Sequence, residues 1–405
     1  MLSETQALLL RMLGKKLFQR QISPYGEADG QLLLTEAMQQ TVFPLVYSEL
    51  VALLPREEQP GARELYFSSV AMSIENARSH GHLHELLSEN GIPYVIIKGM
   101  AAAAYYPVPF QRTMGDVDFL VAREDLARTK ELLLANGYTT HKGDRSRAHI
   151  AFYKEKETLE MHWEPNGVPE GREGDICRQY LADIVERAHL HTTSSGSFLV
   201  PSAFHHGLIL LLHTATHMID TGIGLRHICD WAVFAGSLSD AKFRELFEER
   251  LKNVGLWRFA QLLTQLSSRY LGCPKRSWAM EDVQKPLLSA MMEDIFNSGN
   301  FGQKDQERIN EAKLMTSKET QTVTGGSLSG HLLRSLNEKA EMEMPLLRKP
   351  KARLLLPVGW ACVGLRHLYL VWRGKKPRIH VQKMVRGARK RSQIYKEFYL
   401  FKRRG

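Results

Sequence analysis

Two aspartates separated by a single residue, Asp116 and Asp118, stand in the stretch RTMGDVDFLV, before an unbroken apolar run. Side chains alternate faces along a β-strand, so a strand here would put both carboxylates on one face and Val117, Phe119 and Val121 on the other. Two like charges this close repel each other, and burying them unpaired costs free energy. The pattern therefore favours a cation between the carboxylates, or carboxylates that stay in contact with water.

A second stretch, TLEMHWE at residues 158–164, shows the same alternation and puts Glu160 and His162 on one face. If this strand neighbours the first, Glu160 becomes a third carboxylate near Asp116 and Asp118. Hard oxygen ligands suit Mg²⁺ or Mn²⁺, and two such ions roughly 3.5 to 4 Å apart hold an attacking oxygen and a leaving phosphate in line. The simpler alternative is a solvated strand whose acids pair with lysines.

Upstream, the stretch IIKGMAAAA ends a predicted strand at Lys98 and Gly99 and opens a helix of small residues. Free backbone N–H groups at a helix start, a glycine that permits close approach and a nearby lysine together make a phosphate cradle. Arg112 precedes Asp116 by four residues, and its planar guanidinium fits phosphate oxygens. A surface lysine and a loop salt bridge are the alternatives for Lys98 and Arg112.

The elements that must position these residues form a small α/β unit over roughly residues 86–165, in the order helix, strand, helix, strand, helix, strand, strand. Helical spacing dominates before this unit and again from about residue 200. The predicted fold class is therefore α+β, with a small mixed-sheet core embedded between an N-terminal helical segment and a larger C-terminal helical region. The expected divisions are 1–90 helical, 91–200 core, 201–302 helical, 303–343 polar connection, and 344–405 apolar segment with a basic tail.

Several segments together resemble a known family. IKGMAAAAYYPVPFQRTMGDVDFLV, LEMHWEP, LLHTATHM, GLRHICDWAVF, GNFGQK and KARLLLPVGW, in this order over roughly residues 90–375, are similar to the uncharacterised nucleotidyltransferases of the DNA polymerase beta nucleotidyltransferase superfamily. Members are often found in bacterial surface-polysaccharide and peptide-modification gene neighbourhoods.

The resemblance implies roles for individual residues. Asp116 and Asp118 would ligate Mg²⁺ or Mn²⁺, Glu160 would complete the site as ligand or base, and Gly99 would lie under the nucleotide phosphates. The superfamily usually follows this glycine with serine or a second glycine, whereas this chain has Met100. The substrate-binding residues expected on this basis are Lys98, Gly99, Arg112, Gly115, His162, His213, His217, Arg226 and Asp230.

Three histidines, His206, His213 and His217, share one face of a predicted helix. A zinc site is disfavoured because no acidic or cysteine partner stands at ligand spacing. Since the resemblance includes His213, His217, Arg226 and Asp230, a helical wall facing the nucleotide or the acceptor is the favoured interpretation. Alternatively Arg226 and Asp230, at positions i and i+4, form a helix-surface ion pair.

The net charge of +10 is unevenly distributed. Residues 345–405 hold 18 of the 54 Lys and Arg residues and one acid, Glu397. Such a tail favours a polyanionic partner, whether nucleic acid, an anionic membrane surface or an acidic polymer. Four scattered cysteines and the absence of an export signal predict a cytoplasmic protein, peripheral to the membrane at most.

Residues 354–372 are apolar nearly all round, yet Pro357, Arg366 and His367 interrupt them and the run is shorter than the ~20 residues of a membrane span. No transmembrane helix is therefore expected. Packing onto the helical domain is favoured, with the basic tail free to touch a membrane or a polymer; an interfacial helix is the alternative.

The expected activity is metal-dependent transfer of a nucleoside monophosphate from a nucleoside triphosphate to a hydroxyl or phosphate acceptor, with release of pyrophosphate. A sugar phosphate, a peptide, a protein or an RNA end could serve as the acceptor. One alternative is a metal phosphohydrolase that uses His213, His217 and Asp230. The other is a non-catalytic nucleotidyltransferase-like binding module with a basic tail.

Overall fold

The computed structural model describes most of the chain up to residue 304 and parts of the remainder. The described residues are 2–21, 28–141, 148–279, 285–304, 337, 340–341, 344–348, 354–373, 387 and 391–401. Most of the predicted polar connection, 303–343, and much of the basic tail therefore fall outside the described residues. The family-like segment KARLLLPVGW is described only from residue 354.

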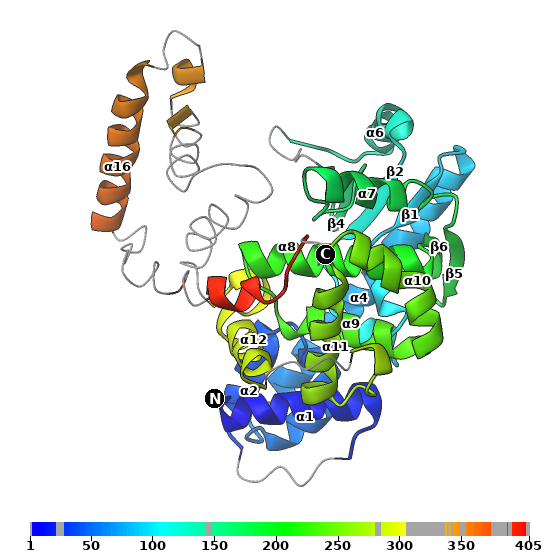
Figure 1. Ribbon diagram of the computed structural model, residues 1–405, viewed down its shortest axis with the longest axis vertical. Coiled ribbons are helices and arrows are strands. Elements are labelled where there is room, and N and C mark those ends of the chain that lie inside the picture. Colours follow the sequence, from blue (N-terminus) through cyan, green and yellow to red (C-terminus); the bar gives the residue numbers. More distant parts are fainter. Residues whose placement is uncertain are drawn as a thin grey trace.

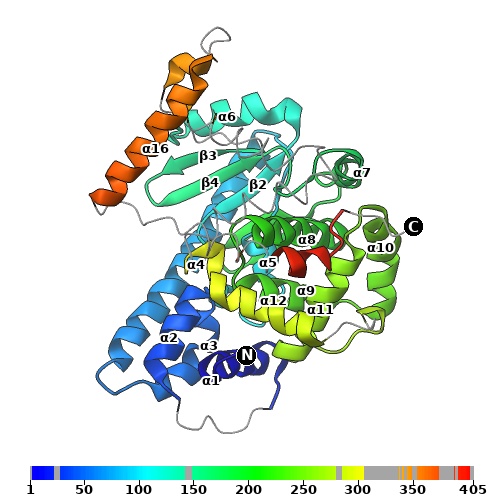
Figure 2. The same cartoon turned by 60° about the vertical axis from the view of Figure 1, so that its left-hand side comes forward.

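The N-terminal region is helical. Its helices are α1 (Glu4–Phe18), α2 (Gly30–Gln39), α3 (Phe43–Leu50), the short η1 (Val51–Leu53) and the long α4 (Gln59–Glu89). Ser3 begins α1 in a capping box, accepting from the backbone N–H of Gln6 while the Gln6 side chain accepts from the backbone N–H of Ser3. The glycine-terminated helical pattern before residue 91 thus corresponds to α4, which runs from this region to the sheet (Figure 2).

A four-stranded mixed sheet follows, with its strands in the order β1-β2-β4-β3. The central pair, β2 and β4, is parallel, and both outer pairs are antiparallel. The bounds are β1 (Tyr94–Ile96), β2 (Val117–Val121), β3 (His149–Lys154) and β4 (Glu157–His162). The expected α+β class, with a small mixed sheet between helical regions, is confirmed.

The two faces of the sheet belong to different hydrophobic cores. Val117, Phe119 and Val121 of β2 pack with one core, whereas Leu120 packs with the larger core formed by the surrounding helices. The alternation read from the sequence thus separates the two faces of β2. Helix α5 (Met100–Ala103) and helix α6 (Leu126–Ala135) pack with the core of Val117 and Phe119, and α8 (Ala203–Asp220) lies on the other side of the sheet (Figure 2).

The region after the sheet is built from helices that pack around the larger core. They are α8 (Ala203–Asp220), α9 (Leu225–Ser237), α10 (Asp240–Asn253), α11 (Trp257–Leu271) and α12 (Lys285–Ser298). Residues 391–401 return to this region (Figure 1), where the Tyr395 hydroxyl oxygen lies 2.6 Å from the Met218 carbonyl oxygen and 2.9 Å from Asp294 Oδ2, and Phe398 is fully buried. The last described part of the basic tail is therefore anchored to the fold.

Two features between the sheet and α8 were not anticipated. Helix α7 (Arg172–Leu181) precedes a hairpin of β5 (His189–Thr193) and β6 (Gly196–Val200). The hairpin packs beside the sheet, and the backbone N–H of Leu199 donates to the Tyr94 hydroxyl of β1.

Helix α16 (Leu356–Trp372) corrects the expectation that the apolar segment packs onto the helical domain. In both views it lies apart from that domain (Figures 1 and 2), and Leu354, two residues before it, and its last residue Trp372 are 89% and 79% exposed. One face packs locally, because a Cβ on Gly359 would meet Leu347 and Ala340. Among the described residues, none of the helices has the length and apolarity that crossing a membrane requires.

Candidate active site

The parallel pairing of β2 with β4 brings the carboxylates together. Asp118 lies directly opposite Glu160 in the register, and Asp116 immediately precedes β2. One carboxylate oxygen from each of the three residues lies within 4.8 Å of the others. The sequence predicted that Glu160 would lie near Asp116 and Asp118 if their two strands were neighbours, and β2 and β4 are neighbours.

Asp118 is buried and doubly bound. Its Oδ1 accepts from Lys98 Nζ at 2.6 Å and lies 3.0 Å from His162 Nε2. Burial alone would raise the pKa of Asp118, but the charge of Lys98 and the hydrogen bond from His162 outweigh burial and hold the pKa well below its usual range. Asp118 is therefore ionised at any physiological pH.

The pKa of Asp116 is shifted in the opposite direction to that of Asp118. The charge of Asp118, followed by burial, raises the pKa of Asp116 to about 6, although Lys98 and Arg226 act in the other direction. A carboxylate destabilised by a second carboxylate, with a third within reach, is a donor set that fits a hard divalent cation. The cluster could thus hold such an ion, and its ligands would be oxygens of Asp116, Asp118 and Glu160.

Gly99 makes the turn between β1 and α5 in a conformation that side chains disfavour, with φ 53° and ψ −117°. A Cβ at this position would meet His80 Nε2 at 3.0 Å. His80 is fully buried on α4, where its Nδ1 bonds the Asn76 carbonyl, and burial lowers its pKa to about 4. The backbone of Gly99 thus approaches a neutral imidazole, so the position excludes a side chain.

Replacing Gly99 by Ala is expected to lower the free energy of unfolding by about 1 to 3 kcal/mol, because the residue must keep its positive φ and displace His80. Gly115 provides the control, since a Cβ there has nothing within 4 Å. Urea denaturation measures the free energy of unfolding of Gly99→Ala and of Gly115→Ala. Equal stability of the two variants would contradict the strain argument.

The expected phosphate cradle is smaller than the sequence suggested. Helix α5 is a single turn, Met100–Ala103, and all four of its residues are buried. A helix this short contributes little dipole. The helix ends before Pro107, which cannot continue it. Tyr106 is buried there, and its hydroxyl donates to Asp230 at 2.6 Å.

Arg112 and Asp230 form a buried ion pair that joins the loop before β2 to α9. Arg112 Nε and Nη2 each donate to a different carboxylate oxygen at 2.7 Å, and Nη1 donates to the Gly99 carbonyl at 3.3 Å. Burial would raise the pKa of Asp230, but Arg112 outweighs it and lowers the pKa to about 2. The structure therefore places Arg112 against Asp230 and Gly99, which is the salt-bridge alternative.

Arg226 does not make the suggested surface pair with Asp230. Its Nη1 donates to the Thr113 carbonyl at 3.1 Å, and its Nε has no hydrogen-bond partner among the described residues. Burial, followed by the charge of Arg112, lowers its pKa, and its charge acts on Asp116. Arg226 is thus a partly buried cation on the Asp116 side of the site.

His213 and His217 meet a third histidine, His227. The His213 ring centroid lies 4.3 Å from that of His217 and 5.5 Å from that of His227, and the Phe301 ring lies 4.8 Å from His217. Burial lowers the pKa of all three imidazoles, and for His213 and His217 the next cause is the charge of Lys98. The cluster is therefore neutral at pH 7 and lies close enough to Lys98 to sense its charge.

Sequence reasoning missed four residues of this region: His80, Tyr106, His227 and Phe301. His80 comes from α4, outside the predicted core, and nothing local indicates that it lies under Gly99. His227 could have been found, because it follows Arg226 in a segment already singled out. Phe301 carries a weaker signal, the glycines at 299 and 302 that flank its own left-handed φ of 53°.

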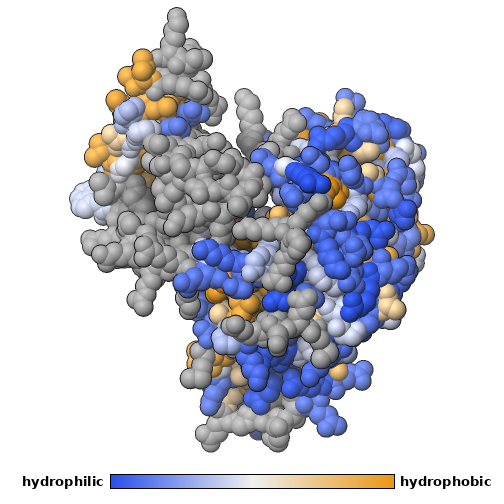
Figure 3. All heavy atoms as spheres, viewed as in Figure 1, coloured by the Kyte–Doolittle hydropathy of each residue, from blue (hydrophilic) through white to orange (hydrophobic). Residues whose placement is uncertain are grey.

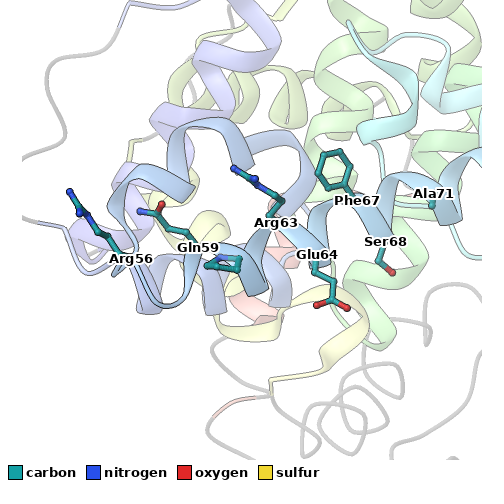
Figure 4. Close-up of a pocket in the computed structure, with 8 residues that line it drawn as sticks. Arg56, Gln59, Arg63, Glu64, Phe67, Ser68 and Ala71 are labelled. Atoms are coloured by element: carbon teal, nitrogen blue, oxygen red, sulfur yellow. The ribbon is translucent and has the colours of Figure 1, made fainter.

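A surface groove on α4 lies apart from the carboxylates. Its lining comes from Arg56 and from α4 residues between Gln59 and Ala71, including Arg63, Glu64 and Phe67 (Figure 4). Apart from Arg56, its side chains are arranged along this one helix, and they bring together no set of groups able to hold a metal. The carboxylate cluster is therefore the candidate active site.

The chain belongs to the family described as uncharacterised nucleotidyltransferase, whose model matches residues 26–272. The match includes the N-terminal helices from α2 onward, the sheet and the helices through α11, and ends before the GNFGQK and KARLLLPVGW segments. No curated protein matches the chain. A general nucleotidyltransferase role follows from the family, and the acidic cluster supplies residues able to bind a divalent metal.

Proposed function

We propose that the protein is a metal-dependent nucleotidyltransferase that moves a nucleoside monophosphate from a nucleoside triphosphate to a hydroxyl or phosphate acceptor and releases pyrophosphate. The observation that carries the proposal is the register of β2 and β4. It brings oxygens of Asp116, Asp118 and Glu160 within 4.8 Å of one another, in a chain of a nucleotidyltransferase family.

The three carboxylates would hold Mg²⁺ or Mn²⁺, and Glu160 serves as ligand or as base. A divalent cation bound there neutralises charge on the phosphates and favours in-line displacement. Lys98 binds Asp118 with a side chain that is still 18% exposed, and the charge of Arg226 acts on Asp116; both would supply positive charge for the triphosphate. Arg112 would act indirectly. It binds the Gly99 carbonyl and so holds in place the turn that would approach the phosphates.

The cluster of His213, His217 and His227 would contact the nucleotide or the acceptor. Because His213 and His217 are neutral at pH 7, they act as hydrogen-bonding groups rather than as cations. His162, between Asp118 and Glu160, orients both carboxylates. Gly115 precedes Asp116, and a Cβ at this position would have nothing within 4 Å, which leaves room for the substrate beside it.

The test compares two glutamates of β4 that point to opposite faces. Glu160 shares the face of Asp118, whereas Glu157 bonds Ser79 and the Tyr138 hydroxyl on the other side. With each of the four nucleoside triphosphates and Mg²⁺ or Mn²⁺, Glu160→Gln is expected to lower pyrophosphate release at least about 100-fold. Glu157→Gln is expected to keep it. Absence of metal-dependent triphosphate binding at millimolar concentration would refute the proposal.

The phosphohydrolase alternative receives less support. Asp230 is bound by Arg112 and Tyr106, and neither metal-capable group found among the described residues includes His213, His217 or Asp230. The non-catalytic alternative predicts that triphosphate binds and pyrophosphate release is equal in Glu160→Gln and in the unmodified chain. The same experiment therefore separates both alternatives from transfer.

We also propose that α16 rests on an anionic membrane surface. Val358, Leu365, Tyr369 and Trp372 are each more than half exposed, and their spacings of seven, four and three put them on one face of the helix, with the exposed Leu354 just before it. Figure 3 shows hydrophobic side chains gathered on this part of the molecule. The aromatic pair lies at the end from which the basic tail continues, as expected for an interfacial helix beside anionic headgroups.

Flotation with vesicles tests this surface. The chain is expected to bind vesicles of phosphatidylglycerol and phosphatidylcholine, but not phosphatidylcholine alone, and Leu365→Glu is expected to weaken binding at least about tenfold. Phe67→Glu is the matched control, because Phe67 is 61% exposed on α4. Equal binding of both variants would contradict the proposal. So would a dimer that Leu365→Glu dissociates, which would assign the face to a second copy.

A further inference from the structure

A second group able to hold a metal adjoins the carboxylate cluster. It consists of His149 on β3 and Glu160 and His162 on β4. His149 and His162 are direct partners in the antiparallel register, and Glu160 lies two residues before His162. Residues directly opposite and two apart share one face of a sheet, so strand geometry alone brings the three side chains together.

The distances suit a shared ligand. Glu160 Oε2 lies 3.4 Å from His162 Nε2 and 3.9 Å from His149 Nε2, and all three ligand atoms lie within 4.8 Å of one another. The two imidazole centroids are 4.9 Å apart. His162 is fully buried, whereas the side chains of His149 and Glu160 are 21% and 23% exposed. An ion could thus enter from the His149 side and keep water ligands.

The orientation of His162 supports ligation. Its Nε2 faces Asp118 and Glu160, while its buried Nδ1 has no hydrogen-bond partner among the described residues. In the metal-free chain Nε2–H donates to the ionised Asp118, so a metal ligated by Nε2 would take the place of that hydrogen and Nδ1 would carry the imidazole proton. An ion there would sit between one imidazole and a carboxylate at the floor of the site.

We propose that His149, Glu160 and His162 form a transition-metal position that shares Glu160 with the Asp116–Asp118 position. Two imidazoles and one carboxylate suit Mn²⁺, Co²⁺ or Zn²⁺, whereas Mg²⁺ prefers oxygen ligands. The candidate site is then asymmetric, with an all-oxygen position on the β2 side and a nitrogen-rich position on the β3 side. A role of this ion in transfer rests on the proposed function, but its binding does not.

Titration of the metal-free full chain with Co²⁺, without nucleotide, tests the position. The visible absorption of Co²⁺ is expected to report nitrogen ligands, and His149→Ala or His149→Gln is expected to weaken this binding at least about tenfold. His189→Ala is the matched control, because His189 is an exposed strand histidine on β5. Thermal unfolding confirms that each variant is folded.

Asp116→Asn separates the two positions. Nitrogen-ligated Co²⁺ binding is expected to persist in this variant within about threefold, because Asp116 belongs only to the carboxylate group. Unchanged Co²⁺ binding in both His149 variants would overturn the proposal, as would a greater loss in Asp116→Asn than in His149→Ala. A chain that binds Co²⁺ through His149 but releases no pyrophosphate would support the metal position and refute the transfer activity.

Discussion

Replacing Asp116 by Asn is expected to raise the free energy of unfolding of the metal-free protein by about 1 to 3 kcal/mol while removing metal-dependent transfer. Asp118, and then burial, raise the pKa of Asp116 to about 6, so the ionised carboxylate is held in the fold against repulsion. The amide is nearly the same size and removes that charge. A substitution that stabilises the fold and abolishes activity is characteristic of a residue kept for function.

The higher stability expected for Asp116→Asn should depend on pH. The folded state holds the Asp116 proton more tightly than the unfolded chain does, so the stability contributed by protonation is complete below about pH 4 and is lost as the pH rises through about 6. The unmodified chain and Asp116→Asn should therefore unfold with similar free energies near pH 4. Above about pH 6 the variant should be the more stable one, as measured by urea denaturation in EDTA.

Divalent cations should make the unmodified chain more stable than Asp116→Asn. Mg²⁺ or Mn²⁺ is expected to stabilise the unmodified chain by mass action and to leave Asp116→Asn nearly unaffected. Glu124→Gln removes a similar charge from the exposed η3 (Arg123–Asp125) and should shift stability by no more than about 0.5 kcal/mol. If Asp116→Asn is less stable than the unmodified chain at pH 7 in EDTA, the repulsion inferred from Asp118 is absent.

The sheet and its carboxylates were predictable because their signals are local. Alternation assigned Val117 and Phe119 to one face of β2 and Asp118 to the other, and the same count placed Glu160 with His162. The sequence did not show that β2 and β4 pair with each other, because which strands become neighbours depends on the whole fold. The parallel register then put Asp118 opposite Glu160.

The remainder depended on contacts between residues distant in sequence. Asp230 stands four residues after Arg226, which suggested a surface pair, yet Arg112 binds it from a different region of the chain. His80 reaches Gly99 because α4 runs behind the sheet, a path that helical periodicity does not specify. For α16, an apolar composition on all faces predicted burial, but composition does not tell packing onto a domain from packing onto another surface.

Replacing Arg112 by Met is expected to lower the free energy of unfolding by roughly 3 to 5 kcal/mol, because it leaves Asp230 buried without its bidentate partner. If Arg112 served only as a phosphate ligand, the same change would raise the KM for the triphosphate and leave stability within about 0.5 kcal/mol. Arg78→Met is the matched control, since Arg78 forms an exposed pair with Glu75 that is worth at most about 1 kcal/mol.

The double variant Arg112→Met with Asp230→Leu isolates the pair. Removing both charges is expected to cost less than the sum of the single changes, because neither ion is then left buried alone, although Tyr106 loses its acceptor. Additive losses in urea denaturation would show that the two side chains are not coupled. Strong coupling would show that the pair joins the Gly99 turn to α9, so that the Gly99 backbone and the α9 residues Arg226 and His227 move as one unit.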